Sequence, residues 1–413
     1  MPERGALLAR RDEREYSRYL SEEQRRQRGC PARQQSCHEP LGRDTSMRIL
    51  ITGGAGFVGS SLALMLKRDR PADDIRVFDN LRRRGSELSL GRLRRAGVEF
   101  THGDVRIADD LAEAGPFDLL IECSAEPSVH AGYGGSPSYV LQTNLVGTIH
   151  CLEAARQYHA DVMMLSTSRV YPIEPLRALP IERRGSRLDL PERATGPGWS
   201  HQGIGTDFPL KGFRSMYGAT KLASELLIEE YRAMYGLRTI VNRCGVISGP
   251  WQMGKVDQGF VVLWASRHLY GGRLSYIGFG GEGVQVRDVL HVADLYDLVR
   301  LQLGDLTRYS GGVYNVGGGR ANSVSLAELT ALCRVRTNAS IAIGSEPQTS
   351  AADVPYYVTD NGAVTAATGW SPSRPFETLL DEVFTWLREH RASLEPVLSG
   401  PAAQPTPATP TVR

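Results

Sequence analysis

The 413-residue sequence has few cysteines, no long apolar run and almost no net charge. Its six cysteines are scattered without a CxxC pair, which argues against a zinc ribbon and against a disulfide scaffold in a chain of this size. Nowhere does the sequence contain eighteen consecutive apolar residues, and its first thirty residues lack the apolar core of a signal peptide. We therefore expect a soluble, cytoplasmic protein with free thiols, no membrane partner and no metal site.

The charges nearly cancel, because 48 Lys and Arg residues face 46 Asp and Glu residues, for a net charge of +2. So weak a field does not favour nucleic acid or a membrane surface as the main partner. With 41% hydrophobic residues the chain can bury a large core, and its length exceeds that of one usual compact domain. One large or two joined domains that act on a small molecule are expected.

Both ends of the chain differ in composition from its middle. Residues 1–46 are rich in Arg, Gln and Glu, and the strand-like run that follows opens at Met47, which is also a candidate initiator. From Ser399 to Arg413 the sequence alternates Pro, Ala and Thr, which cannot offset the entropy cost of ordering. We expect a disordered extension over 1–46 and a disordered tail over 396–413.

Between these ends, short apolar runs alternate with helical patterns. The runs read as buried parallel strands, and the helices expected between them cover 60–66 and 145–157. The strand-like runs are 49–52, 75–78, 119–121 and 162–165. This βαβ pattern predicts the α/β class, with a Rossmann-type doubly wound parallel sheet.

The pattern changes near Gly245, after which glycines, prolines and shorter elements dominate. We predict a cofactor-binding domain over 47–245 that also carries the catalytic residues. A smaller α/β substrate-binding region over 246–395, interleaved with the first, would complete a cleft over the carboxyl ends of the strands.

Three glycines at three-residue intervals follow the first strand and precede the first helix, in the segment 52–59. One glycine permits a tight turn, the next lets backbone approach a pyrophosphate, and the third allows close helix-to-strand packing, while the helix N-terminus offers free N–H groups. The spacing differs from GxGxxG. The residues predicted to bind a dinucleotide here are Gly53, Gly56, Phe57, Val58 and Gly59.

Asp79 lies twenty positions after the last of these glycines, at the end of the next strand. A carboxylate there can accept hydrogen bonds from ribose hydroxyls and repels the 2′-phosphate of NADP, so NAD is the favoured cofactor. The arginines 82–84 leave NADP as an alternative, although such a run is also typical of a solvated loop. Asp104 can bond the adenine amino group or form a surface turn. The remaining residues assigned to the NAD site are Asn80, Val105, Ser124 and Ala125.

Tyr217 and Lys221 stand one helical turn apart, so both side chains project from the same face. A nearby ammonium and the positive nicotinamide ring of oxidised NAD favour the phenolate, which can then take a proton from a sugar hydroxyl. The spacing alone also fits a tyrosine that only packs on an amphipathic helix.

The segment Leu165–Ser168 presents hydroxyls just after a predicted strand, at the same edge as the glycine turn. A hydroxyl there can hold the substrate oxygen beside Tyr217, although hydroxyls at strand ends also cap helices. Together with the glycine turn and Asp79, in this order, these residues predict an oxidoreductive site.

From Met47 to His390 the sequence resembles the extended short-chain dehydrogenase/reductase family of NAD-dependent epimerases and dehydratases. The segment 52–59 resembles the family's TGxxGxxG turn, Asn144 its structural asparagine, and Gln285–Val292 its substrate-domain segment. The resemblance identifies Tyr217 and Lys221 as the catalytic pair. Counting back from Val170–Tyr171, it identifies Thr167 as the catalytic hydroxyl, supported by Ser166 and Ser168.

Within the family, four stretches are most similar to the 2-epimerases of CDP-linked sugars: 77–81, 102–104, 257–260 and 285–291. The resemblance implies a CDP-linked nucleotide-sugar substrate whose C2 is oxidised by tightly held NAD, turned as a ketosugar and reduced on the other face. It also implies a homodimer or higher oligomer. The residues expected to bind substrate are Ser168, Gln258 and Arg287.

Arg287 would meet the diphosphate, which suits a guanidinium through bidentate bonds, or would form a structural ion pair with Asp288 or Asp294. Two departures from the family pattern affect the substrate side. Val246 replaces a common asparagine, and Ser350 stands where the family usually has a second phosphate-binding arginine, for which Arg320 is a possible substitute.

The resemblance leaves other activities open. Dehydratases of the family usually carry acidic residues directly after the catalytic threonine, whereas Ser168 and Arg169 follow here, which argues against dehydration. A UDP- or GDP-sugar 4-epimerase would keep the same catalytic set, a reductase would use dissociable NADPH, and a non-catalytic NAD-binding regulator is the alternative from another class.

Overall fold

The computed structural model of the protein describes residues 46–255 and 258–399. The extension expected over 1–46 lies outside these ranges except for Ser46, and so do residues 400–413. Leu398, inside the expected tail, ends a helix and is buried.

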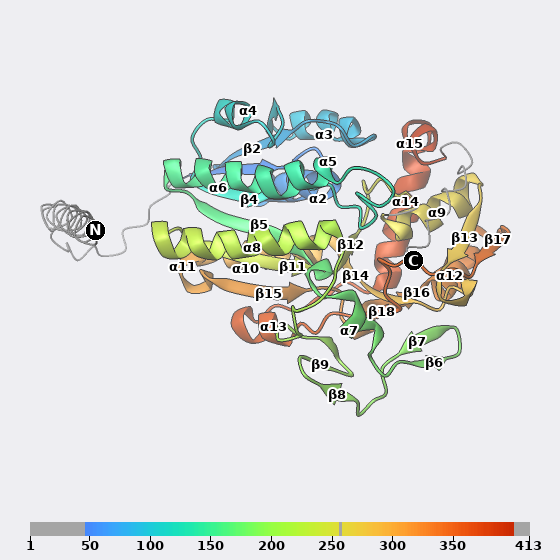
Figure 1. Ribbon diagram of the computed structural model, residues 1–413. Helices are drawn as coiled ribbons and strands as arrows, with labels where there is room; N and C mark the ends of the chain where they lie inside the picture. Colours follow the sequence, from blue (N-terminus) through green and yellow to red (C-terminus); the bar gives the residue numbers. More distant parts are fainter. Residues whose placement is uncertain (1–45, 256–257, 400–413) are drawn as a thin grey trace, which may run out of the picture. The chain divides into compact units, whose positions relative to one another are not determined.

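A seven-stranded parallel sheet forms the centre of the described chain, with the strand order β15-β11-β5-β4-β1-β2-β3 (Figure 1). All neighbours in it pair in parallel. The strands are β1 (Arg48–Thr52), β2 (Asp74–Asp79), β3 (Glu99–His102), β4 (Leu119–Glu122), β5 (Asp161–Thr167), β11 (Thr239–Cys244) and β15 (Gly312–Val316). This order confirms the predicted Rossmann-type α/β fold.

Helices cover both faces of the sheet, which explains why its strands are apolar without alternation. Ile49 and Ile51 of β1 pack in one core cluster, whereas Leu50 between them packs in another on the opposite face. The first cluster takes side chains from α2 (Phe57–Asp69) and α10 (Val292–Gly304), and the second from α4 (Ala108–Glu113), α6 (Gly147–Tyr158) and α8 (Met216–Tyr235).

Short elements connect these layers. They are α3 (Leu90–Arg95), α5 (Ser138–Leu141), the π-helical segment η2 (Gln142–Val146), the 3-10 turn η3 (Ser168–Val170), α7 (Ile173–Arg177), α11 (Leu306–Tyr309) and α13 (Gly362–Thr368).

The C-terminal elements gather beyond one end of the sheet, where β5 and β11 finish (Figure 1). They form a core of their own around α9, α12, α14 and α15. The elements are the mixed sheet of β12 (Val246–Ser248), β14 (Val286–His291), β16 (Ser323–Ser325) and β18 (Tyr356–Tyr357), the pair β13 (Leu274–Ile277) and β17 (Ile343–Glu346), and the helices α9 (Phe260–Tyr270), α12 (Leu326–Thr337), α14 (Phe376–Glu389) and α15 (Arg391–Leu398). Since β15 belongs to the central sheet but follows β12 and β14 in the chain, the two regions interleave.

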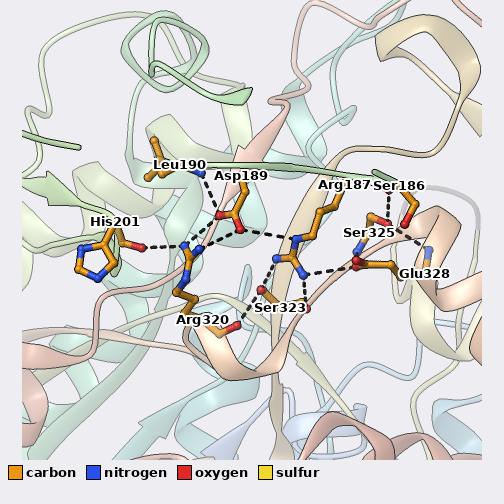
Figure 2. A network of polar contacts seen from close by, with 9 residues as sticks. All are labelled: Ser186, Arg187, Asp189, Leu190, His201, Arg320, Ser323, Ser325 and Glu328. Carbon is orange, nitrogen blue, oxygen red and sulfur yellow. Dashed lines mark hydrogen bonds and ion pairs between the residues drawn. The ribbon is translucent and has the colours of Figure 1, made fainter. Parts of the chain in front are cut away.

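The interval between Thr167 and Tyr217 is filled by two small antiparallel sheets. These are β6 (Glu182–Arg184) with β7 (Arg187–Asp189), and β8 (Thr195–Gly196), β9 (Trp199–Ser200) and β10 (Gly203–Ile204). Figure 2 shows how β7 is fixed to the C-terminal region: Arg187 donates to Ser323 Oγ at 2.6 Å, and Arg320 binds Asp189 through both of its terminal nitrogens at 2.9 Å.

None of the helices within the described ranges combines the length and the hydrophobicity that crossing a bilayer requires.

Candidate functional site

The glycine turn leaves no room for side chains. Gly53 has a φ of +65°, and a Cβ on it would lie 2.8 Å from the carbonyl carbon of Cys123. A Cβ on Gly59 would lie 2.5 Å from Gly53 O. Helix α2 begins at Phe57 without a side-chain cap, so the first N–H groups of the helix remain for a ligand. The turn therefore fits the pyrophosphate of a dinucleotide, which is how NAD would be held here.

Asp79 reaches the glycine turn, as the spacing predicts. Its carboxylate accepts hydrogen bonds from the N–H of Ala55 at 3.1 Å and from the N–H of Leu81 at 2.8 Å. Burial raises the pKa of Asp79, and these backbone bonds oppose that rise. The side chain is half-buried and bridges the turn after β1 to the turn after β2, the position that a ribose-binding acid requires.

Asp104 lies beside Asn80, but it is already paired. Asn80 Nδ2 donates to Asp104 Oδ2 at 2.8 Å, and Arg106 Nη2 donates to the same oxygen at 2.6 Å. Burial raises the pKa of Asp104, yet the bonds from Arg106 and Asn80 outweigh it and lower the pKa to about 2. Val105 is buried, and Ser124 and Ala125 follow β4 next to the glycine turn, with Ser124 N among the nearest atoms to a Cβ on Gly53.

The three residues predicted to be catalytic come together at the end of β5. Thr167 is the last residue of that strand, and Tyr217 and Lys221 stand on the first turns of α8. Ser215 caps α8 by accepting a hydrogen bond from Gly218 N at 3.2 Å, which fixes where the helix begins. Tyr217 is 9% exposed, and the hydroxyl of Thr167 is near enough to lower the pKa of its phenol.

The environment of Tyr217 contains opposing effects on its acidity. Burial raises the pKa of the phenol, while the Lys221 ammonium and the nearby Thr167 hydroxyl lower it. Burial has the larger effect, so the net pKa is raised. The oxidised nicotinamide ring carries a positive charge, so NAD adds a further effect in the direction of the phenolate.

Lys221 forms a buried ion pair with Glu122, at 3.2 Å between Nζ and Oε2. The two side chains are 1% and 2% exposed. Burial lowers the pKa of Lys221, but the Glu122 carboxylate more than offsets this and the net pKa is raised. Sequence reasoning missed Glu122; the signal was a charged residue at the end of an otherwise apolar strand.

We expect Glu122→Gln to change the pH dependence of the enzyme. Without the carboxylate, the buried Lys221 loses its proton at a lower pH, so the alkaline limb of the pH–rate profile moves down by about 1–3 units. Wild type keeps its activity to higher pH, because its Lys221 pKa is raised. Initial rates across the pH range, on protein with the same NAD content, measure the shift.

Thr148→Val provides the matched control for this variant. Thr148 Oγ1 donates to Glu122 Oε1 at 3.3 Å, so the substitution removes a hydrogen bond from the same carboxylate and keeps its charge. Its alkaline limb should coincide with that of wild type. An unmoved limb in Glu122→Gln would show that Glu122 does not maintain the charge of Lys221.

Asn144, the structural asparagine, ties the loop after β4 to the catalytic helix. Its Oδ1 accepts from Glu126 N at 2.7 Å, and its Nδ2 donates to Thr220 Oγ1 at 3.3 Å. It lies fully buried in the π-helical segment η2, an irregularity common at functional sites. Since Thr220 directly precedes Lys221, Asn144 helps to fix the helix turn that carries the ammonium.

A second buried ion pair lies next to Thr167 and contacts the residue before it, Ser166. Arg243 of β11 contacts Glu225 of α8, with Nη2 2.8 Å from Oε2, and Glu225 also accepts from Ser166 Oγ. Arg243 Nη1 donates to the phenol oxygen of Tyr171 at 3.2 Å. Burial opposes the charge of Arg243, but Glu225 outweighs it and raises the pKa. Strand β5, strand β11 and helix α8 are thereby held together beside Thr167.

On the substrate side, Arg287 forms an ion pair, but with neither partner that the sequence suggested. Its Nη2 donates to Asp353 Oδ1 at 2.8 Å. Asp294 instead binds Arg374, and Asp288 accepts from Gly319 N at 3.0 Å. The pairing with Asp353 spans 66 positions of the chain.

The other substrate residues predicted from the sequence lie in different surroundings. Ser168 opens the turn η3 directly after Thr167. Gln258 contacts Arg83 through its side-chain oxygen, and its backbone N–H donates to Lys255 O at 3.0 Å. Lys255 lines a cavity of about 330 Å³ together with residues of the loop after β4, among them Glu126.

Arg320 is not available as a substitute for the missing phosphate-binding arginine. Both terminal nitrogens bind Asp189, and Nη1 also donates to His201 O at 2.9 Å (Figure 2). Ser350 Oγ accepts from Ala352 N, and Val246 pairs with Val289 in the mixed sheet. These contacts give Arg320 a structural role between β7 and the C-terminal region.

Comparison with known proteins agrees with this arrangement. The model of the NAD dependent epimerase/dehydratase family matches residues 49–317. A CDP-paratose 2-epimerase of Salmonella typhi is 30% identical over 353 residues, which cover 82% of this chain and 99% of that relative. A dTDP-glucose 4,6-dehydratase of Streptomyces niveus is 29% identical over 376 residues, which cover 87% of this chain and 98% of the relative.

Among solved structures, a double mutant of dTDP-glucose 4,6-dehydratase from Streptomyces venezuelae with NAD bound superposes with a TM-score of 0.68. It is 27% identical, and the match covers 85% of this chain and 100% of that one. These comparisons support the predicted fold, the resemblance to NAD-dependent epimerases and dehydratases, and NAD as the cofactor.

Proposed function

Because the chain belongs to the NAD-dependent epimerase/dehydratase family, we propose that it is a nucleotide-sugar epimerase that inverts C2 of a CDP-linked deoxysugar. The observation that carries the proposal is the convergence of Thr167, at the end of β5, with Tyr217 and Lys221, which stand one helical turn apart on the first turns of α8. The 30% identity with a CDP-paratose 2-epimerase over most of both chains supports the choice of sugar and nucleotide.

In the proposed mechanism, NAD supplies a hydride acceptor that also returns the hydride. Thr167 holds the reacting hydroxyl of the sugar beside Tyr217, whose phenolate removes the hydroxyl proton and later gives it back. Lys221 stabilises the phenolate by its charge, and Glu122 keeps Lys221 protonated. Since a proton is taken up and then returned, the protein ends the cycle in its starting state.

Dehydration is the main alternative among the relatives. It needs an acid and a base beside the sugar, whereas the residues that directly follow Thr167 are Ser168 and Arg169. Neither a hydroxyl nor a guanidinium serves as a base near neutral pH. These side chains favour epimerisation, and a 4-epimerase of UDP- or GDP-sugars remains the second candidate, because it would use the same three catalytic residues.

The proposal is tested by NMR of the purified protein incubated with CDP-paratose and no added cofactor. We expect the resonances of the C2 epimer, CDP-tyvelose, to grow in, because NAD is retained from purification. If NAD is bound and no new sugar forms, the proposed substrate is wrong, and UDP- and GDP-sugars are the next to be offered. A requirement for added NADPH would identify a reductase instead.

A further inference from the structure

Arg169 is fixed beside the catalytic hydroxyls by its backbone. Its N–H donates to Thr167 Oγ1 at 3.2 Å, and its carbonyl oxygen lies so close to α8 that a Cβ on Gly218 would be 2.1 Å from it. Gly218 directly follows Tyr217. The turn η3 and the first turn of α8 are therefore packed together, and Arg169 starts from a point next to Tyr217.

The guanidinium of Arg169 extends to the loop 350–353 and to Arg287. Its Nη1 donates to Ala352 O at 3.4 Å, and its Nη2 lies 4.0 Å from Asp353 Oδ1. The same carboxylate oxygen accepts from Arg287 Nη2 at 2.8 Å. Two guanidinium groups from distant parts of the chain thus converge on one carboxylate oxygen.

The two positive guanidinium groups of Arg169 and Arg287 share the single negative charge of Asp353. Burial, helped by the nearby charge of Arg169, lowers the pKa of Arg287 to about 10 against the opposing effect of Asp353. The Asp288 carboxylate also acts to raise the pKa of Arg287, but Asp288 is fully buried and its own pKa is raised by that burial. A polyvalent anion with several acceptor oxygens would complement the two guanidinium groups better than Asp353 alone.

We propose that Arg169 is the second guanidinium that binds the substrate's diphosphate, opposite Arg287, and that Asp353 holds the two arginines in place until the diphosphate replaces it. This inference rests on the proposed function. Arg169 would replace the phosphate-binding arginine that the family usually has at the position of Ser350.

The position of Arg169 also favours reaction at C2. In a nucleotide sugar the diphosphate is attached to C1, so a C2 hydroxyl lies one carbon away from the phosphate-bearing carbon, whereas a C4 hydroxyl lies across the ring. Arg169 is close enough to Tyr217 for its charge to lower the pKa of that phenol. A cation that contacts both the diphosphate and the surroundings of the base suits a substrate whose reacting hydroxyl neighbours C1.

The test compares Arg169→Gln, Arg169→Lys and Arg177→Gln in the NAD-loaded protein, with CDP as the probe in isothermal titration calorimetry. Arg177 is the matched control, because it binds the same loop only through backbone oxygens, with Nη2 2.8 Å from Ser350 O and Nε 2.9 Å from Asp353 O. We expect Arg169→Gln to weaken CDP binding by about tenfold or more, Arg169→Lys to recover part of the loss, and Arg177→Gln to bind nearly as wild type does.

Removing the carboxylate of Asp353, which competes with the diphosphate, should change the affinity for CDP in the opposite direction. Asp353→Asn should bind CDP more tightly than wild type, since the diphosphate no longer displaces an anion from the two arginines. Unchanged CDP affinity in Arg169→Gln, or an equal loss in Arg177→Gln, would overturn the role of Arg169 and leave the proposed function standing. If wild type binds none of CDP, UDP, dTDP and GDP, both the inference and the proposed function are wrong.

Discussion

Replacing Tyr217 by phenylalanine removes the proton acceptor and lowers kcat by about 10²–10⁴-fold, the usual contribution of a general base. The variant keeps the ring that fills the 9%-exposed position and the packing of α8, so its NAD content should equal that of wild type. Turnover of the nucleotide sugar and absorbance of the released cofactor measure the two quantities separately.

Tyr235→Phe is the matched control, because Tyr235 stands at the end of the same helix and is 47% exposed. It loses the same oxygen atom far from the first turn and should keep wild-type activity. If Tyr217→Phe retains activity with its NAD bound, another group takes the proton and the assignment of the base is wrong.

Local sequence patterns predicted where the glycine turn and Asp79 lie relative to each other. The glycine spacing and the strand-ending acid are read within one βαβ unit, and the structure brings Asp79 to the turn at Ala55. The place of Thr167 in the fold was also predictable, since parallel strands end at one edge of the sheet and Thr167 ends β5. Asp79 and the glycine turn are close in sequence, and the place of Thr167 follows from the rule that the carboxyl ends of parallel strands share one edge of the sheet.

The charged contacts of the site were not predictable in the same way. Lys221 pairs with Glu122 across 99 positions, and Arg287 pairs with Asp353 rather than with a neighbour in sequence. Hydrophobic periodicity states which face of an element is buried, but it does not state which of many carboxylates meets a given cation. For the same reason Arg320 looked free for phosphate in the sequence, although it is bound to Asp189.

The long-range pair of Glu225 and Arg243 leads to the largest expected effect on stability. Glu225→Gln leaves the guanidinium of Arg243 buried beside a neutral partner, with only 8% of its side chain exposed. Truncating one partner of a buried ion pair costs about 3–5 kcal/mol, because the remaining charge has lost its compensation. We expect the free energy of unfolding to fall by that amount and the melting temperature by several degrees, measured by denaturant titration and calorimetry.

The exposed ion pair of Glu153 and Arg156 on α6 provides the control for Glu225→Gln. Glu153 binds Arg156 at 2.8 Å with both side chains 38% exposed, so water replaces the lost contact in Glu153→Gln and stability changes little. Glu225→Gln should also reduce kcat, since Glu225 accepts from Ser166, the residue before Thr167. A variant that melts as wild type does would mean that Arg243 finds another partner, of which Tyr171 is the nearest in its hydrogen-bond network. The double substitution Glu225→Gln with Tyr171→Phe would then unfold at a lower denaturant concentration than either single variant predicts, because it removes both groups that compensate the charge.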